Sequence, residues 1–277
     1  MKNYIKLFNF ELGRFLKFYL ILIAITIVSQ ITGVIVSSRS YLSDANEFIY
    51  VNQGSMESFL EQYGQMSMHN ITRTLWFLGP IALCVVTLLI YIFFIWYRDW
   101  FGKNTFIYRL LMLPTARMNV YLAKASTIFL MVLGLISLQL VLIPIEGTIL
   151  QSMVPVDFRL DMSIQEVIGS FDYFGILVPY SFTQFIIHYG IGFMAVFIVF
   201  TAILFERSFR LKGIVLGIVY IAISVVIFIS PLLVDAFLVP NYFYAIELFV
   251  MEIVVGLLVI AGSIWMSNYL LNRKIRI

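Results

Sequence analysis

The chain has 277 residues and a formal net charge of +3, with 62% hydrophobic and only 12% charged residues. Soluble domains average about 25% charged residues, so this composition excludes an ordinary water-soluble domain and indicates a protein largely surrounded by lipid. A nucleic-acid partner is not expected, because no basic stripe lies on a soluble face. The single cysteine, Cys84, excludes disulfide scaffolding within the chain and a cysteine-based metal cluster.

Six apolar stretches are long enough to cross a membrane, since a spanning helix needs roughly 20 residues. They do not alternate in polarity as the strands of a membrane barrel would. We therefore predict an all-α, polytopic membrane protein with six transmembrane helices, and we treat residues 1–277 as a single transmembrane domain. The predicted spans are Phe18–Val36, Trp76–Tyr97, Ser126–Ile149, Ser181–Phe205, Gly213–Leu233 and Ala245–Leu270.

The lysines and arginines predict the orientation, because cytoplasmic segments are enriched in them. Fifteen of the 18 fall in four segments on one side, namely Lys2, Lys6, Arg14, Lys17, Arg98, Lys103, Arg109, Arg117, Lys124, Arg207, Arg210, Lys212, Arg273, Lys274 and Arg276. Only Arg39, Arg73 and Arg159 fall on the other side. Both termini are therefore predicted to be cytoplasmic, and the segments 37–75 and 150–180 to be extracellular.

The first 17 residues carry an apolar face at helical spacing, and the first apolar run is too long for a cleavable signal peptide. This face holds Tyr4, Phe8, Leu12, Phe15 and Leu16. A basic amphipathic helix of this kind lies in the membrane interface. The alternative is a positive anchor that only fixes the topology, which explains the lysines but not the ordered aromatic face.

The second extracellular segment contains Ser163 and Glu166 at the spacing of a capping box. This spacing predicts the start of a short helix on the outer membrane interface, and an ordered loop remains the alternative.

The segment 98–124 joins the second and third spans on the predicted cytoplasmic side. Gly102 interrupts regular structure in this segment. Asn104 or Thr105 can then cap a short helix over Phe106–Met112, and Pro114 ends that helix. The helix presents apolar residues beside basic ones. Lipid would satisfy its apolar face, and so would a groove on another protein.

The run Leu111-Met112-Leu113-Pro114-Thr115-Ala116-Arg117, followed by Tyr121-Leu122-Ala123-Lys124, resembles a segment of bacterial ABC exporter permeases of the type 2 class. In that family the segment leads from the second span into the third, and six spans, cytoplasmic termini and an N-terminal interfacial helix are typical. The resemblance implies a permease subunit of the bacterial plasma membrane. It would pair with a second permease copy or paralogue and export an amphipathic peptide, a lipid-like molecule or an antimicrobial compound.

The resemblance also implies that the short loop helix couples the permease to a cytoplasmic ATPase. The implied coupling residues are Phe106, Tyr108, Arg109, Leu110, Leu111, Pro114 and Arg117. The chain itself has no G-x-x-x-x-G-K-[ST] phosphate loop. ATP and Mg²⁺ are therefore expected on a separate ATPase chain, and no cofactor is expected on this one.

Polar residues inside predicted spans are costly and become candidates for lining a cavity. Glu146, His188, Glu247, Glu252 and Gln30 fall at similar depth towards the outer side. Together they predict a polar vestibule that opens outwards. Glu146 and Glu247 can instead reach the head groups, and His188 can be a hydrogen-bonded residue between helices; Glu252 is the deepest acid.

Catalysis is not expected, because the chain has two histidines and neither H-E-x-x-H nor G-x-S-x-G. We predict no catalytic residue and no metal site. Two other functions stay open: a membrane scaffold or sensor that binds an extracellular ligand through 37–75 and 150–180, and an ion-driven secondary transporter. The second is weakened by the lack of acids identified in the inner half of the spans.

Overall fold

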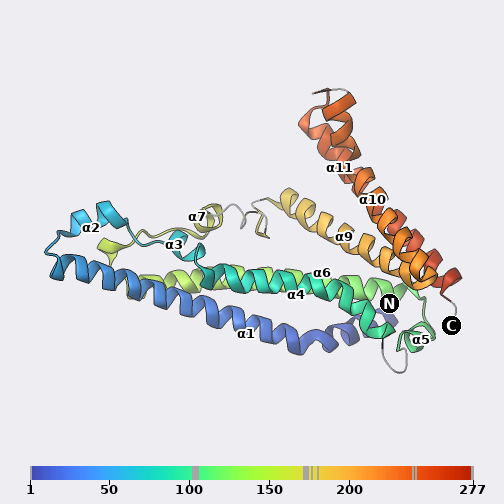
Figure 1. The fold of residues 1–277 in the computed structure, drawn as a ribbon, viewed down its shortest axis with the longest axis horizontal. Helices are drawn as coiled ribbons and strands as arrows, with labels where there is room; N and C mark the ends of the chain where they lie inside the picture. The colour runs from blue at the N-terminus through green and yellow to red at the C-terminus, as the bar shows by residue number, and fades with distance from the viewer. Residues whose placement is uncertain are drawn as a thin grey trace. The chain divides into compact units, whose positions relative to one another are not determined.

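The computed structural model describes residues 2–101, 106–170, 175, 177–179, 181–238, 240 and 242–275. Within these residues it contains helices, turns and one isolated β-bridge, and six helices are long and apolar enough to cross a membrane. This confirms the predicted all-α fold with six spans. The six helices are α1 Lys2–Asn46, α4 Leu75–Trp100, α6 Met118–Met153, α9 Phe182–Phe209, α10 Leu211–Leu233 and α11 Ala245–Tyr269 (Figure 1).

Shorter helical elements connect or extend these spans. They are η1 Glu47–Val51, α2 Met56–Tyr63, α3 Met68–Thr72, α5 Phe106–Leu111, η2 Val156–Phe158, α7 Ile164–Gly169, η3 Val234–Leu238 and η4 Leu270–Lys274. The predicted helix after the second span corresponds to α5. Its proposed caps Asn104 and Thr105, together with Gly102, lie outside the described residues.

α1 is longer than its predicted span, because it continues without interruption through residues 17 and 18. The predicted interfacial segment 1–17 is therefore the first part of one long helix. Its most buried positions are Leu7, Glu11 and Phe15 at four-residue spacing, whereas Leu16 is exposed. A carboxylate thus occupies the centre of the buried face. The location of this segment at a membrane interface stays a prediction.

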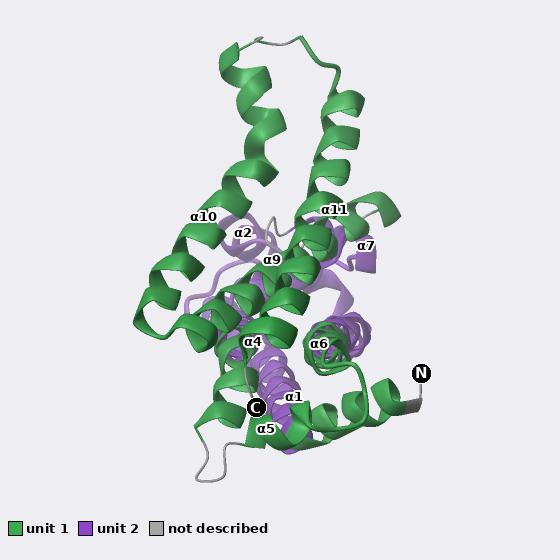
Figure 2. Ribbon diagram, turned by 90° about the vertical axis from the view of Figure 1, so that its right-hand side faces the viewer, with its two compact units in different colours: residues 1–14, 88–130, 181–277 green, residues 15–87, 131–180 purple. Residues whose placement is uncertain are grey.

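The described residues form two compact units (Figure 2). Unit 1 comprises residues 1–14, 88–130 and 181–277, and unit 2 comprises residues 15–87 and 131–180. The prediction that residues 1–277 form one domain stays a prediction.

In unit 1, two glycines let α10 approach α9 closely. A Cβ atom on Gly213 would lie 2.1 Å from the carbonyl oxygen of Phe205, and one on Gly217 would lie 3.0 Å from that of Ala202. Hydrogen bonds between hydroxyl groups join α11 to α9 and α10. Thr201 Oγ1 and Ser267 Oγ are 2.9 Å apart, and Tyr220 Oη and Ser263 Oγ are 2.7 Å apart. The helices α9, α10 and α11 are therefore held together by small and hydroxyl side chains, as in many membrane helix pairs.

In unit 2, Tyr41 packs against an apolar core that includes Val34, Met66 and Leu150, and its ring makes an edge contact with that of Phe59. The 37–75 and 150–180 segments meet at a β-bridge, where Met66 N donates to the Phe158 carbonyl at 2.9 Å. The two predicted extracellular segments are therefore joined by backbone hydrogen bonds.

The capping box predicted at α7 is confirmed. Glu166 N donates to Ser163 Oγ at 3.3 Å, and Ser163 N donates to Glu166 Oε2 at 2.7 Å. The backbone hydrogen bond from Ser163 lowers the pKa of the Glu166 carboxyl below its ordinary value, because it stabilises the charged form. The location of α7 on the outer membrane interface stays a prediction.

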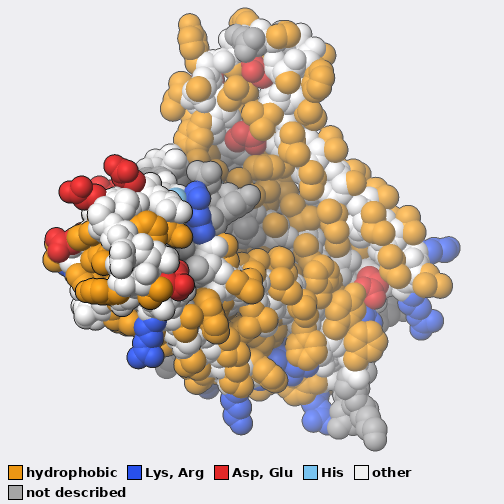
Figure 3. Space-filling model, turned by 60° about the vertical axis from the view of Figure 1, so that its left-hand side comes forward, with side chains coloured by type: hydrophobic (Ala, Val, Ile, Leu, Met, Phe, Trp, Pro, Cys, Tyr) orange, Lys and Arg blue, Asp and Glu red, His pale blue; other side chains and the backbone are white. Residues whose placement is uncertain are grey.

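Large apolar side chains are exposed along the spans. On α10, Val215, Ile218 and Val226 are each more than half exposed, and hydrophobic side chains cover much of the face shown in Figure 3. Soluble proteins rarely expose contiguous apolar surface of this extent. Lipid is therefore the solvent for these faces, as expected for a multi-pass membrane protein.

Candidate functional sites

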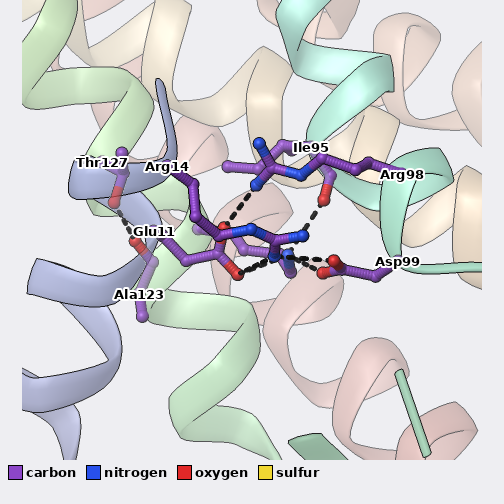
Figure 4. Close-up of polar contacts among 8 residues, drawn as sticks. Glu11, Arg14, Ile95, Arg98, Asp99, Ala123 and Thr127 are labelled. Carbon is purple, nitrogen blue, oxygen red and sulfur yellow. Dashed lines mark hydrogen bonds and ion pairs between the residues drawn. The ribbon is translucent and has the colours of Figure 1, made fainter. Parts of the chain in front are cut away.

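A largely buried network of five charged side chains joins α1, α4 and α6 in unit 1 (Figure 4). Lys124 Nζ donates to Asp99 Oδ2 at 2.5 Å, to Glu11 Oε1 at 2.7 Å and to the Ile95 carbonyl at 2.9 Å. An ammonium group has three donors, so all of them are used. The Lys124 and Asp99 side chains are fully buried, and that of Glu11 is 2% exposed.

Two arginines complete the ion network. Arg14 Nη1 lies 2.7 Å from Asp99 Oδ1, and Arg98 Nη2 lies 3.0 Å from Glu11 Oε2. Every carboxylate oxygen of Glu11 and Asp99 therefore has a cationic partner. Such complete pairing offsets the large desolvation cost of burying charge, and removal of one partner typically costs about 3–5 kcal/mol.

The sequence prediction missed this network. Arg14 and Arg98 were interpreted only as orientation signals, and Lys124 as an orientation signal and part of the family resemblance. Glu11 and Asp99 were not identified among the acids within spans. Glu11 was detectable in principle, because it lies four residues from both Leu7 and Phe15 on an otherwise apolar helix face. Which cations it meets was not detectable, since Glu11 and Lys124 are 113 residues apart.

α5 is attached to this network through aromatic and cationic contacts. Phe106 packs on Phe10 with ring centroids 5.8 Å apart, and the Arg14 guanidinium lies 5.2 Å from the Phe106 ring centroid. Tyr108 makes an edge contact with Trp100. Cation–π contacts of this kind typically contribute about 0.5–2 kcal/mol. A displacement of α5 would therefore act directly on Arg14 and its carboxylate partners.

Of the predicted coupling residues, two are buried and two are exposed, and the remaining three, Phe106, Tyr108 and Arg117, are half-buried. Leu110 and Leu111 are 5% and 4% exposed, so they anchor α5 within unit 1. Arg109 and Pro114 are exposed, and so are two residues outside that set, Met112 at 67% and Leu113 at 41%. We call Arg109, Met112, Leu113 and Pro114 the α5 surface. It is an accessible part of this segment that another protein could contact.

Arg117 binds the chain's own C-terminal segment. Its Nη1 donates to the Leu271 carbonyl at 2.5 Å and to the Ile275 carbonyl at 3.1 Å. A cation at the end of a helix stabilises its unpaired carbonyl groups. Arg117 thus holds the end of η4 to the start of α6.

A cavity of about 490 Å³ lies between α9, α10 and α11 of unit 1. Among the described residues that line it, Glu252 is the one charged or polar side chain, and the apolar ones include Ile187, Met194, Phe228 and Phe249. The volume falls in the range of small-molecule sites, which are mostly apolar with a few placed polar groups. Both carboxylate oxygens of Glu252 are buried without a hydrogen-bond partner among the described residues.

Of the predicted cavity residues, Glu252 lines this cavity, while Glu247 and His188 are not among the described lining residues. Glu247 is exposed and its Oε2 accepts from Tyr244 N at 3.0 Å, so it caps the start of α11. His188 is half-buried on α9. The structure therefore assigns Glu247 a local role in helix capping.

Gln30 and Glu146 belong to unit 2. Gln30 Nε2 donates to Gln139 Oε1 at 3.0 Å, which is a hydrogen bond between α1 and α6. Glu146 is fully buried, and neither of its carboxylate oxygens has a hydrogen-bond partner among the described residues. The vestibule predicted from all five residues stays a prediction.

The described residues contain no group of three or more His, Cys, Asp or Glu side chains that could hold a metal ion. Comparisons of the chain with protein-family models, with curated proteins and with solved structures find no match. The class of the protein therefore follows from its fold: an all-helical, multi-pass membrane protein with six helices able to span the bilayer.

Proposed function

We propose that the chain is the permease subunit of an ATP-driven ABC exporter of the type 2 class in the bacterial plasma membrane. Both termini and α5 would face the cytoplasm. A separate ATPase chain would carry ATP and Mg²⁺, and a second permease copy or paralogue would complete the pathway. The cargo would be an amphipathic peptide, a lipid-like molecule or an antimicrobial compound.

The observation that carries this proposal is the α5 surface. Met112 and Leu113 expose apolar side chains beside the exposed cation Arg109, at the connection between two spans. An apolar and basic patch at the end of a short, anchored helix suits a groove on a soluble partner. The resemblance to type 2 permeases implies that this segment couples the permease to an ATPase, so we propose that the α5 surface docks on that ATPase.

The anchoring of α5 suggests how a push from the ATPase would reach the spans. α5 packs inward through Ile107, Leu110 and Leu111, and through Phe106 onto Phe10 and Arg14. Packed cores respond to displacement by moving as bodies, because they are close-packed and poorly compressible. Movement of α5 would therefore move the ends of α1, α4 and α6 together, in a rigid-body transition between facing states.

Photo-crosslinking in native membranes tests the proposal. Benzoylphenylalanine at Met112 should crosslink to a chain that is also labelled by azido-ATP, and Arg109→Glu should reduce the yield. Val215 on α10 is similarly exposed but lies on a span, so the same probe there is the matched control. Crosslinks from position 112 to lipid alone, or an equal yield of the ATP-labelled product from position 215, would contradict the assignment.

A further inference from the structure

The cavity between α9, α10 and α11 combines two properties that point to one class of ligand. Its described lining residues are apolar apart from Glu252, so they favour an apolar body. Glu252 places two buried carboxylate oxygens against that lining, and no described side chain forms a hydrogen bond or an ion pair with them. An uncompensated charge among apolar groups is strongly unfavourable, and a ligand with a cationic group would compensate it.

We propose that this cavity binds a small cationic amphiphile, with its apolar tail between the three helices and its ammonium group on Glu252. A lipid phosphate is disfavoured because the carboxylate would repel it. A bare inorganic cation is disfavoured because such ions need several oxygen ligands, and the described lining offers the carboxylate of one residue. The inference names a substrate class for the exporter proposed above and rests on that function for transport, whereas ligand binding requires no ATPase.

Gly190 of α9 keeps room for the tail. It lines the cavity, and a Cβ atom placed on it would meet no other atom within 4 Å. A larger side chain at this position would therefore enter the cavity without a backbone collision. Gly192 on the same helix is equally open but does not line the cavity, which makes it a matched control.

Glu252 also has a matched control on its own helix. Glu247 lies five residues earlier on α11, is exposed and caps the helix start. It carries the same charge outside the described lining. The pair separates the effect of a carboxylate in the cavity from the general attraction of a cation to an acidic protein surface.

The experiment measures binding of tetradecylamine and of uncharged tetradecanol to the purified full chain in phosphatidylcholine nanodiscs, with empty nanodiscs as the reference. The wild-type protein should bind the amine at least about tenfold more tightly than the alcohol, corresponding to about 1.4 kcal/mol. Glu252→Gln should abolish this preference, while Glu247→Gln should retain it. Gly190→Leu should weaken binding of both ligands, and Gly192→Leu should leave both unchanged.

Equal affinity of the wild-type protein for amine and alcohol would overturn the proposal, and so would a preference that survives in Glu252→Gln. If the Glu252→Gln variant does not fold, the proposal is still tested by the amine–alcohol comparison in the wild-type protein and by the binding measured for Gly190→Leu. Equal binding of both ligands to all variants would mean that only bilayer acyl chains fill the cavity. The binding results can contradict the proposed ligand while position 112 still crosslinks to an ATP-labelled chain. In that case the proposed permease function is retained and the proposed substrate class is rejected.

Discussion

Unit 1 buries carboxylates in two contrasting ways. In the ion network, each oxygen of Glu11 and Asp99 has a cationic partner, and Lys124 uses all three of its donors. In the cavity, both oxygens of Glu252 are without a hydrogen-bond partner among the described residues. The ion network pairs its carboxylates within the chain, whereas the described residues leave Glu252 unpaired, and the proposed cationic ligand would pair with it.

This contrast shows why a buried charge alone does not mark a functional site. Ionisable groups within spans are expected to serve function by default, yet a fully paired network is equally suited to holding helices together. The partner of each group, more than its depth or residue type, separates structural charge from a binding site. The ion network would serve transport by transmitting force, and Glu252 by recognising a ligand.

The largest expected effect comes from breaking the network at its centre. Lys124→Met keeps the length of the side chain but leaves Glu11 Oε1 and Asp99 Oδ2 buried without their ammonium donor. We expect the free energy of unfolding to fall by about 3–5 kcal/mol, because unpaired buried charges are costly. Denaturant titration of the protein in bicelles measures the change.

Lys212→Met is the matched control for this prediction, because Lys212 is exposed at the start of α10. Its effect should stay within about 0.5 kcal/mol. If Lys124→Met and Lys212→Met were equally stable, the network would not contribute to the fold as described.

The same substitution, Glu→Gln, should have a smaller effect on stability, and this effect should differ between the ion network and the cavity. Glu11→Gln removes a charge with three cationic neighbours, so stability should fall by about 1.5–3 kcal/mol. Glu252→Gln replaces a carboxyl group that has no described partner, so stability should stay unchanged or rise by about 1 kcal/mol. The same titration compares both variants with the wild-type protein, and a loss of similar size in both would remove the distinction between the two regions.

The smallest effect concerns an exposed carboxylate, which extends the comparison beyond buried groups. The pKa of Glu166 is lowered by the Ser163 backbone hydrogen bond, so its charged form stabilises α7. This contribution is fully present above the ordinary carboxyl pKa of about 4.3, and it is lost as the pH falls through the lowered pKa of the folded state.

Hydrogen exchange of the α7 amides, corrected for intrinsic pH dependence, measures this loss. Opening of α7 should become a few-fold more frequent at low pH in the wild-type protein. Glu166→Gln should show no such pH dependence, since an amide can occupy the capping position without titrating. The same pH dependence in that variant would assign the effect to another group.

The sequence by itself determined the number and type of the spanning elements. Apolar runs such as Trp76–Tyr97 and Gly213–Leu233 correspond to α4 and α10, because a chain in lipid must satisfy its backbone hydrogen bonds within the segment. The short helix at Phe106 and the capping box at Ser163 could also be predicted, because both depend on neighbouring residues alone. The lengths of α1 and α6 were underestimated, because polar residues at a helix end do not interrupt the backbone hydrogen bonds.

Only the tertiary structure decided which of the polar residues meet. Lys124 and Glu11 form an ion pair across 113 positions of sequence, and a hydropathy pattern contains no information about such a pair. Glu247 and Glu252 have the same side chain on one helix, but one caps the helix start and the other lines a cavity. Their difference depends on the direction in which each side chain points and on the space left by α9 and α10, because charge and space become complementary only when distant helices pack.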